Sequence, residues 1–173
     1  SYTYFRSEFS GLDGVLRPSA WDTNHLLSAL LGRQFGKGWQ MGLRYRMAGG
    51  APYTPWDEAA SRANFTSTGA GVLDFTRLNT RRLDTFHQFD FRIDKQLNFR
   101  RQALNVYFDV TNAFLLPNPG PPQYTFQRDP TNPTQFASTD GQPVRPDGSN
   151  AIPVLFDDAD PLVIPTIGII FQF

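Results

Sequence analysis

Three stretches of the chain alternate apolar and polar residues with the two-residue period of a β-strand. In residues 39–48 the odd positions are apolar, from Trp39 to Met47, and the even positions are mostly polar or glycine. In 86–98 the odd positions are again mainly apolar, whereas in 102–114 the even positions are. Successive side chains of a strand point to opposite faces. Each stretch therefore predicts a strand with one apolar face and one polar face.

Similar but weaker patterns predict three further strands, at 1–8, 24–35 and 163–173. The connections between the six strands alternate between tight turns and long segments. The turns are 36–38 and 100–101, and the long segments are 9–23, 49–85 and 115–162. No segment sustains the 3.6-residue period of a helix, so we predict no helix. Short turns at one end and long loops at the other are typical of outer-membrane barrels.

The parity of the apolar positions also predicts how the strands pair. A two-residue turn at 100–101 would place Ile93 opposite Phe108 on the apolar face and Arg92 opposite Asp109 on the polar face. Residues of like character then meet on both sides of the hairpin. A three-residue Gly-Lys-Gly turn at 36–38, with glycine supplying the positive φ, would direct four residues of 24–35 to the apolar face: Leu27, Ala29, Leu31 and Phe35.

The predicted fold class is all-β, with residues 1–173 forming an antiparallel transmembrane β-barrel segment of about six strands. Six strands cannot close a barrel across a bilayer, because about eight is the practical minimum. Unpaired backbone groups in lipid cost several kcal/mol each. We therefore expect the remaining strands to come from a missing N-terminal part of the same protein, or else from another chain.

Composition and charge exclude several functions. The chain has 16 basic and 16 acidic residues, so no nucleic-acid partner is predicted. It has no cysteine, which excludes disulfides and thiolate metal sites. No apolar run is long enough for a transmembrane helix. Sixteen phenylalanines favour β-structure.

Six strings of the sequence and its final strand resemble the late barrel of TonB-dependent outer-membrane receptors. The strings are WDTNH at 21–25, GKGW at 36–39, GGAPYTP at 49–55, RLD at 82–84, FDFRIDK at 89–95 and NVYFDVTNAF at 105–114. The resemblance covers nearly all of the predicted strands and their order, and it leaves the long loops out. It extends to the large receptors of Bacteroidetes and related phyla, some of which act with a surface lipoprotein lid.

This resemblance implies a location in the bacterial outer membrane and a barrel of about 22 strands around an N-terminal plug. The chain would supply barrel wall and external loops of a transporter that imports an unidentified ligand. Its partners would be the remainder of the barrel and the plug, the outer-membrane lipid, TonB through the plug, the barrel assembly machinery and, in some relatives, a surface lipoprotein. The residues that resemble the assembly signal are Ile167, Ile169, Phe171 and Phe173.

Four residues are candidates for contact with a ligand. Tyr53 and Trp56 lie in a long predicted loop, where they would stack on a sugar ring or join an aromatic girdle. Arg44 and Arg46 lie on a polar face, where they would contact a passing solute or pair with carboxylates across strands. The pairing role is the more common for such a ladder.

No catalytic residue, metal site or cofactor is predicted. His25 and His87 are the only histidines, and neither belongs to a ligand or nucleophile motif. The acidic run at 157–160 lacks the spacing of an EF-hand. We therefore predict that the protein is not an enzyme.

Two alternatives remain. One is a soluble or surface-attached β-sandwich that binds carbohydrate or protein. The other is an outer-membrane enzyme whose site lies at the barrel rim and depends on His25.

Overall fold

The computed structural model describes residues 1–157 and 159–173. Within them the chain is mostly β-structure, with one α-helix and two short 3-10 turns. In chain order the elements are β1 (Tyr2–Tyr4), β2 (Glu8–Ser10), β3 (Leu16–Pro18), β4 (His25–Phe35), η1 (Gly36–Gly38), β5 (Trp39–Ala48), β6 (Pro52–Tyr53), β7 (Trp56–Asp57), α1 (Glu58–Thr68), β8 (Val72–Leu73), η2 (Phe75–Arg77), β9 (Arg81–Arg82), β10 (Phe86–Asn98), β11 (Ala103–Thr111), β12 (Gln123–Phe126), β13 (Pro153–Phe156) and β14 (Ile164–Gln172).

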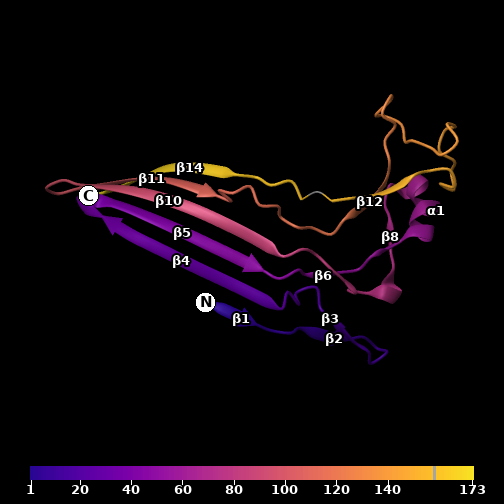
Figure 1. Ribbon diagram of the computed structural model, residues 1–173, viewed down its shortest axis with the longest axis horizontal. Helices are drawn as coiled ribbons and strands as arrows, with labels where there is room; N and C mark the ends of the chain where they lie inside the picture. The colour runs from indigo at the N-terminus through magenta and orange to yellow at the C-terminus, as the bar shows by residue number, and fades with distance from the viewer. Residues whose placement is uncertain (158) are drawn as a thin grey trace.

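One antiparallel sheet of six strands dominates the molecule, in the order β1-β4-β5-β10-β11-β14. Its long strands lie side by side and slightly twisted, with the tight turns gathered at one end and the long connections at the other (Figure 1). The C-terminus lies at the end with the tight turns. The sheet does not close on itself among the described residues, because β1 and β14 each have only one neighbour.

The predicted pairing of β10 with β11 is confirmed. Ile93 lies opposite Phe108 and Arg92 lies opposite Asp109. The backbone N–H of Phe99 donates to the carbonyl of Gln102 at 2.8 Å and closes the turn. Parity was sufficient here because a slip of one residue would have moved every apolar side chain to the polar face.

The hairpin of β4 and β5 also has the predicted register, with Phe35 opposite Trp39. The positive φ angles lie at Lys37 (65°) and Gly38 (77°). Gly38 has a second constraint, because a Cβ there would collide with the carbonyl oxygen of Gln96 on β10.

Two predicted strands are longer than the observed ones. The strand predicted at 1–8 pairs with β4 only from Tyr2 to Tyr4, and the chain then forms a hairpin of β2 and β3. The strand predicted at 102–114 ends at Thr111. Asn112 adopts a φ of 55°, and its backbone N–H donates to Asp90 Oδ1 at 3.0 Å instead of continuing the ladder.

The prediction that the chain contains no helix is wrong, because α1 lies in the segment 49–85. Asp57 caps its N-terminus by accepting a hydrogen bond from the N–H of Ala60 at 2.9 Å, and Gly69 ends it with a φ of 67°. Only Ser61 and Phe65, one turn apart, are buried. The helix is too short and too polar for a periodic signal, whereas its caps are the usual ones.

The two longest loops pack together into a small body beyond the sheet, which we call the loop body. Phe65 from α1, Tyr124 and Phe126 from β12, and Ala151 form its buried core. Trp56, Phe136 and Val144 pack around that core. The segment 115–162, predicted as an irregular loop, is thus largely folded, with β12 paired to β13.

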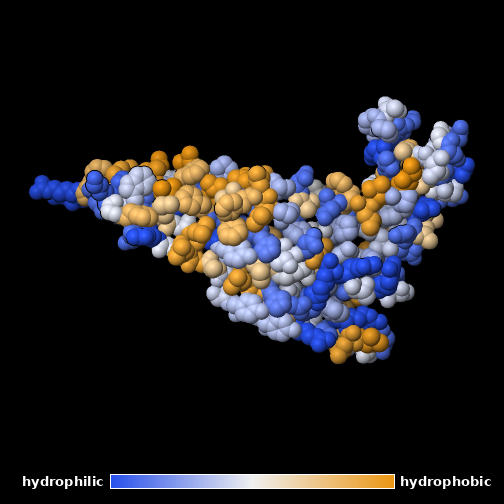
Figure 2. Space-filling view, in the orientation of Figure 1, coloured by the Kyte–Doolittle hydropathy of each residue, from blue (hydrophilic) through white to orange (hydrophobic). Residues whose placement is uncertain are grey.

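The main sheet contributes no residue to this core. Figure 2 shows apolar residues gathered over the long strands and polar residues over the loops. Leu31, Ile167 and Ile169 are 70%, 75% and 68% exposed. Within the described residues, no helix is long and apolar enough to cross a membrane.

Candidate functional site: the two faces of the sheet, its rim and the loop body

Asp90 is the centre of the polar face. Its side chain is 6% exposed and lies 2.7 Å from Nη2 of Arg44 and 3.7 Å from Nη2 of Arg46. It also accepts hydrogen bonds from the side-chain amide of Gln88 at 2.6 Å and from the backbone N–H of Asn112 at 3.0 Å. The structure thus brings both candidate arginines together on one carboxylate. The side chains of Arg44 and Arg46 remain 49% and 44% exposed.

Arg92 makes a second ion pair further along the same face. It donates to both carboxylate oxygens of Asp94, each at 2.9 Å. Asp94 also accepts from Asn105 at 3.1 Å. The predicted partner across the strand, Asp109, lies 3.9 Å away and is therefore a minor partner. The register prediction was right, but the neighbour at i+2 on the same strand provides the better fork geometry.

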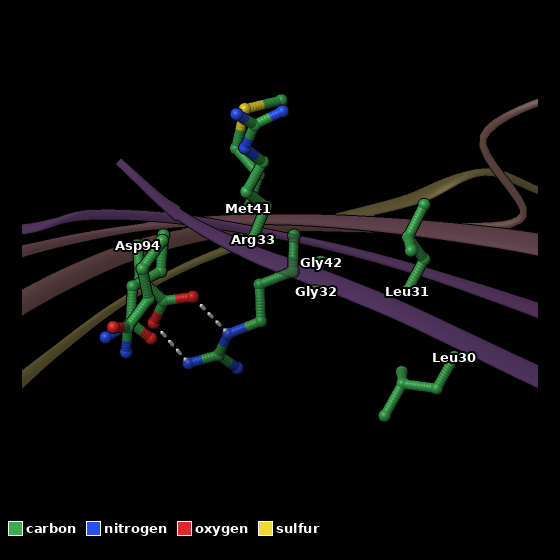
Figure 3. A pocket seen from close by; sticks show the side chains of 10 residues that line it. Leu30, Leu31, Gly32, Arg33, Met41, Gly42 and Asp94 are labelled. Atoms are coloured by element: carbon green, nitrogen blue, oxygen red, sulfur yellow. Dashed lines mark hydrogen bonds and ion pairs between the residues drawn. The ribbon is translucent and has the colours of Figure 1, made fainter. Parts of the chain in front are cut away.

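A shallow depression of about 390 Å³ lies beside this ion pair. Gly32 and Gly42, which face each other on β4 and β5, form its floor, because neither carries a side chain to fill it. In Figure 3 Met41 and Arg33 project from the opposite side of the sheet to Asp94, which shows the separation of the two faces. Leu30 is an apolar exception on the polar side, since it is 79% exposed and borders the depression.

Aromatic and histidine side chains cluster on the apolar face near the loops. The Tyr2 hydroxyl lies 2.7 Å from His25 Nδ1, and the Tyr45 hydroxyl lies 2.8 Å from His87 Nδ1. The rings of Tyr45 and Phe89 stack at 4.4 Å. Both histidines thus belong to Tyr-His pairs on the apolar face. We call this group the loop-side belt.

A second group of aromatic side chains lies on the same face near the tight turns, and we call it the turn-side belt. It consists of Phe35, Trp39, Phe99, Phe171 and Phe173. Along β4, the eleven residues from His25 to Phe35 span about 33 Å. The two belts are therefore about 33 Å apart along the strand direction.

An ion pair with a buried carboxylate links the sheet to the loops, at a place that we call the rim. Asp22 is 2% exposed and lies 2.5 Å from Nη2 of Arg82. Its carboxylate also accepts from the backbone N–H of Ser7 at 2.8 Å and from Asn24 at 3.2 Å. The Ser7 N–H and the guanidinium of Arg82 hold the pKa of Asp22 below its usual value, against the opposing effect of burial.

Two glycines directly after β5 bring that part of the chain to the same rim. A Cβ on Gly49 would collide with the carbonyl oxygen of Thr23, and one on Gly50 would collide with that of Leu83. Arg82 donates to the carbonyl of Gly50 at 3.0 Å. Three of the strings quoted above, WDTNH, GGAPYTP and RLD, therefore meet at one place. Their shared role in this structure is to join the loops to the strands.

Trp56 and Tyr53, the aromatic ligand candidates, lie apart from Arg44 and Arg46. The indole of Trp56 donates to the carbonyl of Pro122 at 2.7 Å and packs on the loop-body core, so it joins two loops. Tyr53 is half-buried and pairs with Arg81 between β6 and β9. The more accessible aromatic side chain is Trp21, which is 81% exposed.

The core of the loop body was missed from the sequence. Phe65, Tyr124 and Phe126 come from segments about 60 residues apart, and no local pattern relates them. The available signal was the Asp57 cap and Gly69, which mark the ends of α1. The acidic run 157–160 includes Asp158, which lies outside the described residues. Among the residues that the structure does describe, no group of three or more His, Asp or Glu side chains could hold a metal ion.

The final strand β14 pairs with β11 along its whole length. Its residues on the apolar face, Ile167, Ile169 and Phe171, are all at least half exposed. On the polar face Gly168 lies opposite Tyr107, whose ring occupies the space that a Cβ would need. The guanidinium of Arg92 covers this ring at 4.0 Å.

Compared with protein-family models, with curated proteins and with solved structures, the chain matches none.

Proposed function

We propose that this chain forms barrel wall and external loops of a transporter in the bacterial outer membrane, of the TonB-dependent kind. The observation that carries the proposal is the uncovered apolar face of the six-stranded sheet. In a water-soluble sandwich a second layer would cover such a face. Within the described residues no second layer covers it, and the buried apolar core lies in the loop body instead.

The two belts support the same reading. Aromatic girdles at both edges of an apolar band are characteristic of strands that cross a bilayer. The tyrosine hydroxyls and histidines of the loop-side belt provide polar groups for the interface. The opposite face carries paired charges, as expected where strands line a polar interior.

The two free edges of the sheet would pair with further strands. β1 covers β4 only between His25 and Leu27, and β14 has no second neighbour in the described part of the chain. Open edges are not stable in hydrocarbon. The remainder of the barrel, with its plug, is therefore the first partner that we propose. Recognition by the assembly machinery through the terminal residues Ile167 to Phe173, coupling to TonB through the plug, and contact with a surface lipoprotein follow from the resemblance alone.

Arg44 and Arg46 would then face the interior, where Asp90 neutralises much of their charge. This arrangement favours a structural role with weak contact to passing solute. The identity of the ligand would depend on the loops and the plug.

Cell fractionation tests the proposal. We expect the protein in the outer-membrane fraction, extractable only with detergent. Recovery as a soluble monomer without detergent would contradict the proposal and favour the β-sandwich binding module. Hydrolytic activity that is lost when His25 is replaced would favour the outer-membrane enzyme, against our prediction that the protein is not one.

A further inference from the structure

The ionic residues are distributed unequally between the two ends of the sheet. We define the turn end as residues 33–41, 93–108 and 167–173, which comprise the two tight turns and the adjoining strand segments. The strand register sets these limits at one level, because Arg33 pairs with Met41, Met41 with Ile93, Ile93 with Phe108 and Phe108 with Ile167. Asp94 is the only one of the 16 acidic residues located there. It is already paired with Arg92 at 2.9 Å.

Five other basic residues lie at the turn end, and none of them pairs with a carboxylate in the described structure. They are Arg33, Lys37, Lys95, Arg100 and Arg101. All except Lys95 are exposed. Figure 2 shows the outermost tip of this end as strongly hydrophilic, and Figure 1 identifies that tip as the β10–β11 turn.

Two of these cations are held against the turn-side belt. The ammonium group of Lys95 lies 4.8 Å from the centre of the Trp39 ring and donates to the carbonyl of Lys37 at 2.5 Å. The guanidinium of Arg33 lies 5.4 Å from the centre of the Phe35 ring. Long basic side chains that run along apolar surface and end near aromatic rings are typical of a membrane interface.

We propose that the turn end binds the anionic headgroups of glycerophospholipids in the leaflet that faces the tight turns. This inference rests on the proposed function, because it requires the apolar face to lie in a bilayer. Charge complementarity identifies the occupant. The turn end is positively charged and adjoins an apolar face, which matches a phosphate-bearing headgroup attached to acyl chains. Each basic side chain near an anionic surface adds about 1 kcal/mol to the attraction at physiological ionic strength.

Native mass spectrometry in detergent micelles tests the inference. The protein would be titrated with phosphatidylglycerol or with phosphatidylcholine that carries the same acyl chains, at low ionic strength. For three exposed cations at about 1 kcal/mol each, we expect phosphatidylglycerol to bind about a hundredfold more tightly, and salt to reduce the difference. The variant K37Q/R100Q/R101Q should bind the two lipids about equally.

The matched control is R6Q/R77Q/R145Q, which removes the same number of charges at the loop end. Each of these arginines already pairs with a carboxylate, so the control should keep the preference. Equal binding of the two lipids by the unaltered protein, or an equal loss in both variants, would overturn the inference. A tenfold preference for lipopolysaccharide over phosphatidylglycerol, abolished by K37Q/R100Q/R101Q, would overturn the choice of glycerophospholipid. A protein that stays soluble without detergent would overturn the proposed function as well, whereas entry into micelles without a charge preference would overturn this inference alone.

Discussion

Replacing Asp90 should destabilise the protein more than replacing Asp109, a second acidic residue on the polar face. The Asp90→Ala variant loses a charge-assisted hydrogen bond from Arg44, worth about 1.5–3 kcal/mol. The Arg44 side chain is 49% exposed and stays hydrated, so the lower value applies. The variant also leaves the Gln88 amide and the Asn112 N–H without their acceptor, at about 1 kcal/mol each. The predicted total loss is about 3.5 kcal/mol.

Urea unfolding in detergent micelles, followed by tryptophan fluorescence, would measure this loss. Asp109→Ala is the control. Asp109 is 31% exposed and lies 3.9 Å from Arg92, a long distance for an ion pair, so we predict a loss below about 1 kcal/mol. Asp90→Asn keeps an acceptor for Asn112 and should fall between the two. The reasoning is refuted if Asp90→Ala costs less than about 1 kcal/mol, or if Asp109→Ala costs as much.

Three further predictions concern the rim, the final strand and the loop body. Because the pKa of Asp22 is lowered, its ion pair stabilises the fold above the ordinary pKa of 3.8, and this contribution is lost as the pH falls through the folded pKa. Between pH 5 and pH 2 the free energy of unfolding should therefore fall more steeply in the unaltered protein than in Asp22→Asn. Equal slopes would contradict this prediction. The double variant Phe171→Ala/Phe173→Ala should lower the amount of assembled protein in outer-membrane fractions. Replacing their neighbour on the polar face, Gln172→Ala, should not. Normal levels of the double variant would count against an assembly signal at the terminal residues. Trp56→Phe should cost about 1 kcal/mol and speed proteolysis within 115–162 while leaving membrane levels unchanged, and unaltered proteolysis would show that the indole does not join the loops.

The five long strands of the sheet could be predicted from the sequence because each has a distinct apolar face. The apolar residues have odd numbers in β10 and even numbers in β11, so a shift of one residue would place apolar side chains opposite polar ones. The register that avoids this places Ile93 opposite Phe108. The same argument placed Phe35 opposite Trp39 with a three-residue turn. The ends of β1 and β11 were less predictable, because they depend on side chains that replace ladder hydrogen bonds, such as Asp90 accepting from Asn112.

Of the candidate site, the sequence predicted which face Arg44 and Arg46 share but could not predict that Asp90 receives both. That cluster depends on the pairing of β5 with β10, two strands separated by a long loop. The loop body was unpredictable for the same reason. Its core joins Phe65 to Tyr124 over distances at which no periodic signal exists, and ten of the 14 prolines lie in 115–162 and hide the strands there.

The most direct test of the central claim is to measure which face of β5 meets lipid. The chain contains no cysteine, so single cysteines from 40 to 47 can carry a nitroxide label in the protein reconstituted in bilayers. The account predicts that labels at Met41, Leu43 and Tyr45 are relaxed by oxygen and shielded from a water-soluble nickel reagent, with the reverse at Gln40, Gly42 and Arg44. Exclusion of both reagents from Met41 and Leu43, as in a packed core, would contradict it.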